Sequence, residues 1–384
     1  MPFHTISLQS ATQGLKIQLL AKREYIAMIS DTAQITIDLK SLTPREIERF
    51  CSDTLGRKPG QGTRVAVWLY RRKTETFDAM EDLNKPFREQ LKRSCSISRL
   101  SVEQHCTSED GTEKLLYRLE DGNAVEGVLI PGPGGRLTLC VSSQVGCASG
   151  CRFCLTGSGG FLRNLNAAEI VNQVFAAQNV VGGKTISNIV LMGTGEPLSN
   201  YEPIKSFVEI VTDRNGMGFS PRKVMISTCG LAPMIEKLAD DKVDVSLAVS
   251  LHATTDEVRD RIMPVNKTYP LKRLMKAVRY YCEKTARTAT IEYVLFRGIN
   301  DSHEDTKRLM KLLKDLPCMI NILLFNPYPG CSFERPEEQR AFVMRDMLVN
   351  NGFVTVVRNS RGRDIHAACG QLRATAARAA QNMA

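Results

Sequence analysis

The feature that most constrains the fold is a regular alternation of strand-like and helix-like segments. Short apolar runs predict strands at residues 137–141, 189–192, 224–227, 243–250, 291–295 and 320–324. Between them, apolar residues recur at helical spacing over residues 167–181, 204–211, 232–238, 271–284 and 305–313. Strands joined through helices pair in parallel, so the pattern predicts an α/β protein. About six units are too few for a closed eight-fold barrel, and we expect a partial (βα)6 TIM-like barrel over residues 137–350.

Smaller regions flank the predicted barrel. Residues 1–99 have the pattern of a helical accessory domain, with a capping box and first-turn proline at Thr43-Pro-Arg-Glu46 and helical spacing over residues 65–70 and 77–91. Residues 100–136 predict a β extension with a hairpin around Asp121-Gly122. Residues 351–384 are expected to form a C-terminal strand and tail.

The helical region also carries much of the positive charge. Residues 57–99 hold 11 Lys or Arg against 5 Asp or Glu, within a chain of net charge +10. A basic balance favours a polyanionic partner. Because the same stretch contains Trp68, Tyr70 and Phe77, it is either an RNA-binding surface of cations and aromatics or a helical cap whose aromatics belong to its core.

Three of the 12 cysteines are tightly grouped, in the run Cys147-Ala-Ser-Gly-Cys151-Arg-Phe-Cys154 directly after the first predicted strand. Cysteine thiolates bind iron–sulfur clusters, and three of them on a four-iron cluster leave one iron open for another ligand. The alternative is a structural zinc site, which needs four ligands and would have to recruit Cys140.

Polar residues follow the later predicted strands. The second strand ends in Gly193-Thr-Gly-Glu196, and its glycines allow the backbone to approach a ligand closely. Ser227, the run Ser250-Leu-His252, and Asn326 follow further strands, and Cys229 adds a thiol near them. The carboxyl ends of parallel barrel strands face one mouth, so we expect these residues to share a pocket with the cysteines.

The cysteine spacing after the first strand resembles that of radical S-adenosylmethionine (radical SAM) enzymes. The resemblance implies a 4Fe-4S cluster on three cysteines, namely Cys147, Cys151 and Cys154. It also implies that S-adenosylmethionine is contacted by Gly195, Glu196, Ser227, Ser250, Leu251, His252 and Asn326. The cofactor carries the radical chemistry, and the protein orients it.

Further motifs resemble a narrower family, the dual-specificity RNA adenine methyltransferases (RlmN). They are Cys140-Val-Ser-Ser-Gln-Val-Gly-Cys147, Phe325-Asn-Pro-Tyr-Pro-Gly330, Ala368-Cys-Gly-Gln-Leu372 and Val125-Glu-Gly-Val-Leu-Ile-Pro131. The resemblance covers nearly the whole chain. It implies methylation of carbon-2 of an adenosine in the peptidyl-transferase region of 23S rRNA and of the adenosine adjacent to the anticodon in tRNA. The rivals are carbon-8 methylation of the same rRNA adenosine by a sister enzyme and a non-catalytic zinc and RNA-binding protein.

The resemblance also implies a mechanism that uses two S-adenosylmethionine molecules per turnover. Cys369 would take a methyl group as a thiolate, so we expect the site to lower its pKa. A radical formed on that methyl group would add to the adenine, and Glu126 would accept the ring proton. Cys140 is the candidate thiol that releases the protein–RNA adduct by leaving a disulfide, with a buried, inert strand thiol as the alternative.

The expected partners follow from the same family. They are 23S rRNA, tRNA and an electron donor such as a flavodoxin or ferredoxin system. No run of 18 apolar residues is present, so we expect no membrane span. We further expect a monomer in the reducing cytoplasm, where free thiols persist.

Overall fold

A ten-stranded sheet organises the computed structural model, which describes residues 36–372. Its parallel part contains β6 (Leu137–Cys140), β9 (Asn188–Leu191), β10 (Val224–Thr228), β11 (Ser246–Ser250), β12 (Ala289–Leu295), β13 (Cys318–Leu324) and β14 (Val354–Arg358), paired in that order. The predicted α/β class is confirmed. The sheet order ends at β14 and at β3, so within the described residues the sheet stays open, consistent with a partial barrel.

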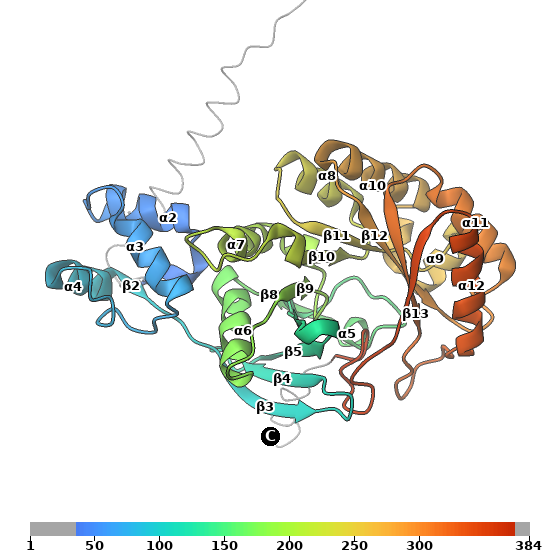
Figure 1. Cartoon of the computed structure of the whole chain (residues 1–384), viewed down its shortest axis with the longest axis horizontal. Coiled ribbons are helices and arrows are strands. Elements are labelled where there is room, and N and C mark those ends of the chain that lie inside the picture. Colours follow the sequence, from blue (N-terminus) through green and yellow to red (C-terminus); the bar gives the residue numbers. More distant parts are fainter. Residues whose placement is uncertain (1–35, 373–384) are drawn as a thin grey trace, which may run out of the picture.

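Helices join these strands and cover the outer face of the curved sheet (Figure 1). They are α6 (Ala167–Val180), α7 (Tyr201–Thr212), α8 (Ala232–Asp240), α9 (Asp256–Ile262), α10 (Leu271–Thr285), α11 (His303–Leu313) and α12 (Glu338–Asn350). Each helix predicted in this region is present. The helices α9 and α12 are additions to the predicted set, and so is the parallel pairing of β14, which extends the sheet beyond residue 350. The predicted strand over residues 243–250 begins only at Ser246, and residues 243–245 connect it to the turn that follows α8.

The β extension is part of the same sheet. β3 (Ser101–Thr107), β4 (Glu113–Arg118) and β5 (Ala124–Pro131) are antiparallel, and β5 pairs with β6. The predicted hairpin around Asp121-Gly122 is present between β4 and β5. Continuity from β5 to β6 places residues of the extension beside the first strand of the parallel sheet.

The N-terminal module packs beside α6 and α7 (Figure 1). It contains β1 (Ile37–Asp38), α2 (Pro44–Arg49), α3 (Gln61–Ala66), α4 (Lys85–Ser94) and β2 (Cys95–Ser96). The predicted capping box of α2 is present. The helix expected over residues 77–91 begins only at Lys85, where Asn84 caps it. The residues before it form turns, and their apolar side chains are nevertheless buried. The spacing of these side chains therefore indicated that they are buried, and not that they form a helix.

The aromatic residues of this module belong to its interior. Tyr70 and Phe77 are buried, and the Tyr70 hydroxyl donates to the carbonyl of Leu42 at 2.5 Å. Trp68 is half-buried under the guanidinium of Arg72. The cap interpretation therefore holds for these aromatics, while Arg72 and its neighbours remain exposed as a basic surface. The part of the predicted 1–99 domain before residue 36, and the tail after residue 372, lie outside the described residues.

No helix among residues 36–372 is long and apolar enough to cross a membrane.

Candidate active site

A cavity of about 1070 Å³, part of it open to solvent, lies at the carboxyl ends of the parallel strands. Its wall includes ten of the predicted site residues, namely Cys147, Cys151, Cys154, Gly195, Glu196, Ser227, Ser250, His252, Asn326 and Cys369. Cys229 also lines it. The topology therefore brings one pocket together from segments more than 200 residues apart. Glu126, Cys140 and Leu251 do not line the cavity.

The loop of residues 147–154, called the cysteine loop below, is held by a small two-stranded sheet. β7 (Gln144–Gly146) precedes Cys147, and β8 (Phe161–Asn164) pairs with it after the short helix α5 (Leu155–Ser158). The Cys147 amide donates to the Gly160 carbonyl at 2.8 Å. Gly146 has φ +76°, and a Cβ there would lie 2.0 Å from the Gly160 carbonyl oxygen, so only glycine allows this pairing.

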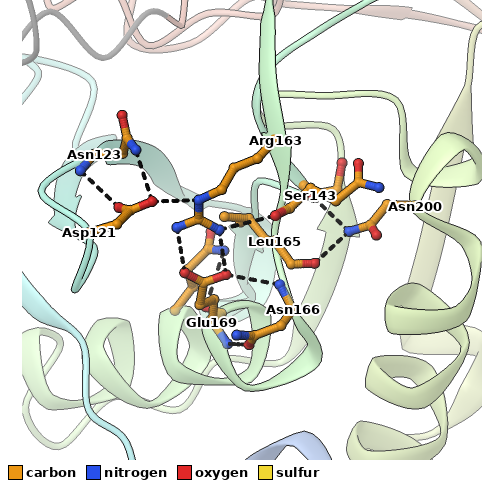
Figure 2. Close-up of polar contacts among 10 residues, drawn as sticks. Asp121, Asn123, Ser143, Arg163, Leu165, Asn166, Glu169 and Asn200 are labelled. Carbon is orange, nitrogen blue, oxygen red and sulfur yellow. Dashed lines mark hydrogen bonds and ion pairs between the residues drawn. The ribbon is translucent and has the colours of Figure 1, made fainter. Parts of the chain in front are cut away.

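Polar contacts fix this sheet to the rest of the fold (Figure 2). Arg163 on β8 bonds Asp121 at 2.5 Å and both oxygens of Glu169 at 2.8 and 2.9 Å. The Asn200 side chain donates to the carbonyls of Ser143 and Leu165 at 2.9 and 2.7 Å. The turn between β4 and β5, the start of α6 and the segment after β9 thus all support the cysteine loop.

The three thiols fit a cluster better than a single ion. Burial and the neighbouring thiolates raise the pKa of Cys151, and burial also raises that of Cys147, so their thiolates need a bound cation to compensate them. Three thiolates are sufficient to hold a four-iron cluster, whereas a structural zinc site needs a fourth ligand. Cys140, the fourth ligand of the zinc alternative, lies in a separate apolar cluster.

Glu196 is placed by close contact between two strand ends. Gly195 has φ +112°, and a Cβ there would lie 2.7 Å from the side chains of Ser143 and Gln144. The Glu196 carboxylate accepts the amides of Leu198 at 3.0 Å and Cys229 at 2.7 Å. Burial raises its pKa, and these two bonds oppose the rise. Each oxygen retains acceptor capacity, so the carboxylate can accept hydrogen bonds from an ammonium group in the cavity.

The run Ser250-Leu-His252 forms a tight turn at the end of β11. His252 has φ +54°, and the Ala253 amide donates to the Leu251 carbonyl at 2.8 Å. The His252 Nδ1 accepts the Val294 amide at 3.1 Å, and its ring meets Phe153 edge-on at 5.1 Å. Burial, together with the charge of Arg259, lowers the pKa of His252 to about 3, so the ring is neutral at pH 7. Leu251 is fully buried and can offer only its backbone to a ligand.

The C-terminal segment brings Cys369 into the cavity. The Gly370 carbonyl accepts the Leu155 amide at 2.7 Å, the Leu372 carbonyl accepts the Thr156 hydroxyl at 2.7 Å, and Asn326 donates to the Cys369 carbonyl at 3.4 Å. The segment is thus bonded to the helix that follows Cys154 and to the end of β13. We expected a lowered pKa for Cys369; although the residue is exposed at the cavity, desolvation of its sulfur by the surrounding protein instead raises the pKa, with Arg358 acting in the opposite direction.

Glu126 and Cys140 lie on the sheet beside this segment. Glu126 on β5 is buried, and Lys114 on β4 is 3.4 Å from its Oε1. Cys140 pairs with Val128 on β5, so the alternation of side chains puts Glu126, Val128 and Cys140 on one face. Val128 and Cys140 pack in an apolar cluster with Leu372. Burial raises the pKa of Cys140 to about 12, with Cys369 as a further cause.

Two charged residues of the cavity wall were absent from the sequence prediction. Glu292 on β12 is buried, accepts the Asn321 amide at 2.9 Å and lies 3.8 Å from Arg358 on β14. Burial raises the pKa of Glu292, and Arg358 opposes the rise. The sequence did offer a signal for Glu292, because it is a glutamate within an otherwise apolar strand. The position of a residue in a strand, however, does not show whether its side chain points into a barrel or toward solvent.

The chain matches two family descriptions. Residues 141–310 match the Radical SAM superfamily, and residues 37–97 match the ribosomal RNA large subunit methyltransferase N-terminal domain. The Geotalea uraniireducens "Dual-specificity RNA methyltransferase RlmN" is 46% identical over 337 residues, which is 88% of this chain and 96% of that protein. The Geobacter sulfurreducens protein of the same name is 47% identical over 337 residues, 88% and 92% of the two chains.

The chain belongs to the RlmN family. A crystal structure of a radical SAM methyltransferase from Sphaerobacter thermophilus is 42% identical, has a TM-score of 0.81 and covers 88% of this chain and 99% of its own. The predicted RlmN resemblance and the radical SAM fold are therefore confirmed. With the fold come the two RlmN cofactors, a 4Fe-4S cluster and S-adenosylmethionine. The role of each site residue remains a prediction.

Proposed function

We propose that this chain methylates carbon-2 of an adenosine in the peptidyl-transferase region of 23S rRNA and of the adenosine adjacent to the anticodon in tRNA. The observation that carries the proposal is the docking of Cys369 against the cysteine loop. A thiol from the end of the chain, bonded through its neighbours to the helix after Cys154, faces the same cavity as the three grouped cysteines. A radical SAM enzyme that does not carry a methyl group on a cysteine has no need for a fourth thiol facing the cluster cysteines.

The cavity supplies positions for both cofactors. Cys147, Cys151 and Cys154 would hold the cluster, which would supply the electron for reductive cleavage of S-adenosylmethionine. The Glu196 carboxylate would accept hydrogen bonds from the ammonium group of S-adenosylmethionine. The strand-end residues Gly195, Ser227, Ser250, His252 and Asn326 line the cavity around the remainder of the molecule, and Leu251 supports this wall from behind.

Three residues act on the methyl group and the base. Cys369 carries the methyl group as a thioether between the two halves of the reaction. Since burial raises the pKa of this thiol, it needs a neighbouring cation to become a nucleophile, and Arg358 in the cavity wall is that cation. Glu126 would accept the proton from the adenine ring. The Cys140 thiolate would then attack the Cys369 sulfur, so that the bond from this sulfur to the methylene carbon breaks, the carbon takes up a proton to become the product methyl group, and a disulfide remains.

The partners follow from charge and chemistry. The exposed cations of the N-terminal module contact RNA phosphates, so affinity falls as salt rises. The target adenosine enters the cavity as an unstacked base. A flavodoxin or ferredoxin system supplies electrons, and the enzyme works as a monomer in the reducing cytoplasm.

The deciding experiment is mass spectrometry of anaerobically reconstituted protein incubated with labelled S-adenosylmethionine and 23S rRNA, comparing the wild type with Cys369→Ala. We expect label on Cys369 and 2-methyladenosine in the RNA, both absent from the variant. Product formed by Cys369→Ala contradicts the carrier role. A product of 8-methyladenosine reassigns the chain to the carbon-8 reaction, and zinc without iron or sulfide in the purified protein supports the non-catalytic alternative.

A further inference from the structure

Arg259 on α9 is a fully buried cation with only neutral partners. Its Nη2 donates to the carbonyls of Cys229 at 2.7 Å and Ser250 at 3.0 Å, and its Nε donates to the carbonyl of Leu251 at 3.1 Å. Its Nη1 donates to the side-chain oxygen of Asn266 at 3.1 Å. A planar guanidinium with five fixed donors can make such a set of bonds, and an ammonium group cannot.

These bonds join the ends of two neighbouring strands. Cys229 follows β10, while Ser250 and Leu251 end β11 and begin the turn around His252. A left-handed φ at His252 is unfavourable for a residue with a side chain and persists only where its surroundings hold it. Arg259 holds the Leu251 carbonyl on one side of this turn, and Asn300 donates to the His252 carbonyl at 2.7 Å on the other.

The neighbouring glycine leaves room for the guanidinium. Gly230 has φ +109°, and a Cβ there would lie 3.2 Å from Arg259 Nη2 and 3.0 Å from Leu274 Cδ1. Side chains at this position would push the guanidinium away from the Cys229 carbonyl. The Ser-Thr-Cys-Gly segment thus ends in the residue that this contact requires.

The charge of Arg259 lies behind the cysteine loop. The Arg152 amide donates to the Ile262 carbonyl at the end of α9 at 3.0 Å, and Cys151 packs in one cluster with Cys229 and Ile262. No carboxylate bonds the guanidinium directly, although Asp256 and Asp260 on α9 act on its charge from a distance. Burial of such a cation is costly, so a further negative group nearby stabilises it. A four-iron cluster on three thiolates is an anion, and it gains one more negative charge when a flavodoxin or ferredoxin gives it one electron.

We propose that Arg259 is a positioning residue with two effects: it fixes the strand ends that surround S-adenosylmethionine, and its charge stabilises the reduced state of the cluster. The inference rests on the cofactors of the proposed function. It requires nothing of the RNA substrate, because every contact that supports it lies between the cysteine loop, α9 and the two strand ends.

Two substitutions separate the effects. Arg259→Gln removes the charge, and Arg259→Lys keeps it but cannot bridge the three carbonyls. Arg273→Gln is the matched control, because Arg273 on α10 is partly exposed and paired with Glu236. All four proteins are first compared for iron content and melting temperature. We then measure the reduced fraction of the cluster at fixed potentials by electron paramagnetic resonance, and the affinity for S-adenosylmethionine by equilibrium binding, both without RNA.

In Arg259→Gln we expect the ratio of reduced to oxidised cluster at a fixed potential to fall by about tenfold, which is 59 mV for a one-electron couple. In Arg259→Lys we expect an unchanged ratio and S-adenosylmethionine affinity weakened by about tenfold, the order of one lost charged hydrogen bond. Arg273→Gln should match the wild type in both.

A wild-type ratio in Arg259→Gln overturns the charge effect, and wild-type affinity in Arg259→Lys overturns the positioning effect. If Arg259→Gln assembles no cluster, Arg259→Met replaces it as the uncharged variant in the measurement of the reduced fraction, where a wild-type ratio rejects the charge effect. Arg259→Lys still tests positioning, and wild-type binding by it rejects that effect. A wild-type protein that holds no cluster would instead contradict the proposed function. If the enzyme methylates a different RNA position, the reduced fraction of the cluster and the affinity for S-adenosylmethionine are unaffected, because both are measured without RNA.

Discussion

The two thiols assigned to the end of the reaction, Cys140 and Cys369, sit in different surroundings. Cys369 faces the cavity, whereas Cys140 is buried beneath Leu372 with a pKa raised to about 12. A thiol with so high a pKa is almost entirely protonated at pH 7 and is a poor nucleophile. In the proposed reaction, attack by Cys140 therefore requires that its thiol first lose its proton.

Replacement of this thiol should trap the reaction. In Cys140→Ser we expect a covalent protein–RNA adduct to accumulate and turnover to fall on the order of 100-fold, the typical effect of losing one participating group. Denaturing gel electrophoresis with labelled RNA measures the adduct. Cys282→Ser, at a buried cysteine on α10, is the control and should behave as the wild type. Normal turnover by Cys140→Ser would contradict the proposed role and show that Cys140 is an inert thiol of the strand.

At the scale of elements, the support of the cysteine loop by β8 depends on Arg163 (Figure 2). Its hydrogen bond holds the pKa of Asp121 well below the usual range. A carboxyl with a lowered folded pKa contributes stability above its unfolded pKa, about 4, and loses it as the pH falls. Both side chains are about one-third exposed, which limits the contribution of the pair.

Arg163→Gln should therefore destabilise the protein at pH 7 by about 1 kcal/mol or less. The difference from the wild type should shrink below about pH 4, where Asp121 of the unfolded chain begins to protonate while the folded carboxylate stays ionised. Urea unfolding at pH 7 and pH 3.5 measures both. Arg273→Gln, which removes the comparable Arg273–Glu236 pair between α10 and α8, is the control and should leave iron uptake unchanged. We expect lower iron uptake in Arg163→Gln. Unaltered iron uptake would show that β8 supports the cysteine loop without the bonds of Arg163 to Asp121 and Glu169.

At the scale of the whole molecule, the N-terminal module is joined to the large sheet through a buried lysine. The ammonium group of Lys40 donates to Asn172 on α6 at 2.8 Å and to the Ser98 carbonyl at 2.9 Å, and it lies 4.7 Å from the Phe175 ring centre. Burial lowers the pKa of Lys40 from 10.5 to about 8. Keeping this amine charged below pH 8 costs on the order of 3 kcal/mol.

The sign of the pH dependence follows from that shift. Between pH 8 and 10.5 the unfolded chain binds a proton at Lys40 that the folded chain has released, so this residue makes folding more favourable as the pH rises. We expect the melting temperature of the wild type minus that of Lys40→Met to increase over this range. Taking the difference cancels groups common to both proteins. A constant difference would show that Lys40 keeps its ordinary pKa at the junction.

Much of this protein is determined by the sequence itself, because the deciding signals are local. Alternating apolar segments specify the helices and strands, since each element must bury one face. The spacing of Cys147, Cys151 and Cys154 specifies the cluster loop, and the glycines at Gly146 and Gly195 mark backbone positions that no other residue can occupy. Together with the motifs around Glu126 and Cys369, these features were sufficient to identify the family.

Other properties depend on residues distant in the sequence and are set only by tertiary structure. The register of β5 against β6 places Glu126 and Cys140 on one face, and the bonds of residues 369–372 bring Cys369 to the cysteine loop. The raised pKa of Cys369 and the neutral partners of Arg259 are likewise absent from any local pattern. Burial and charge at one point are sums over every neighbour in space, and the folded chain alone decides which neighbours those are.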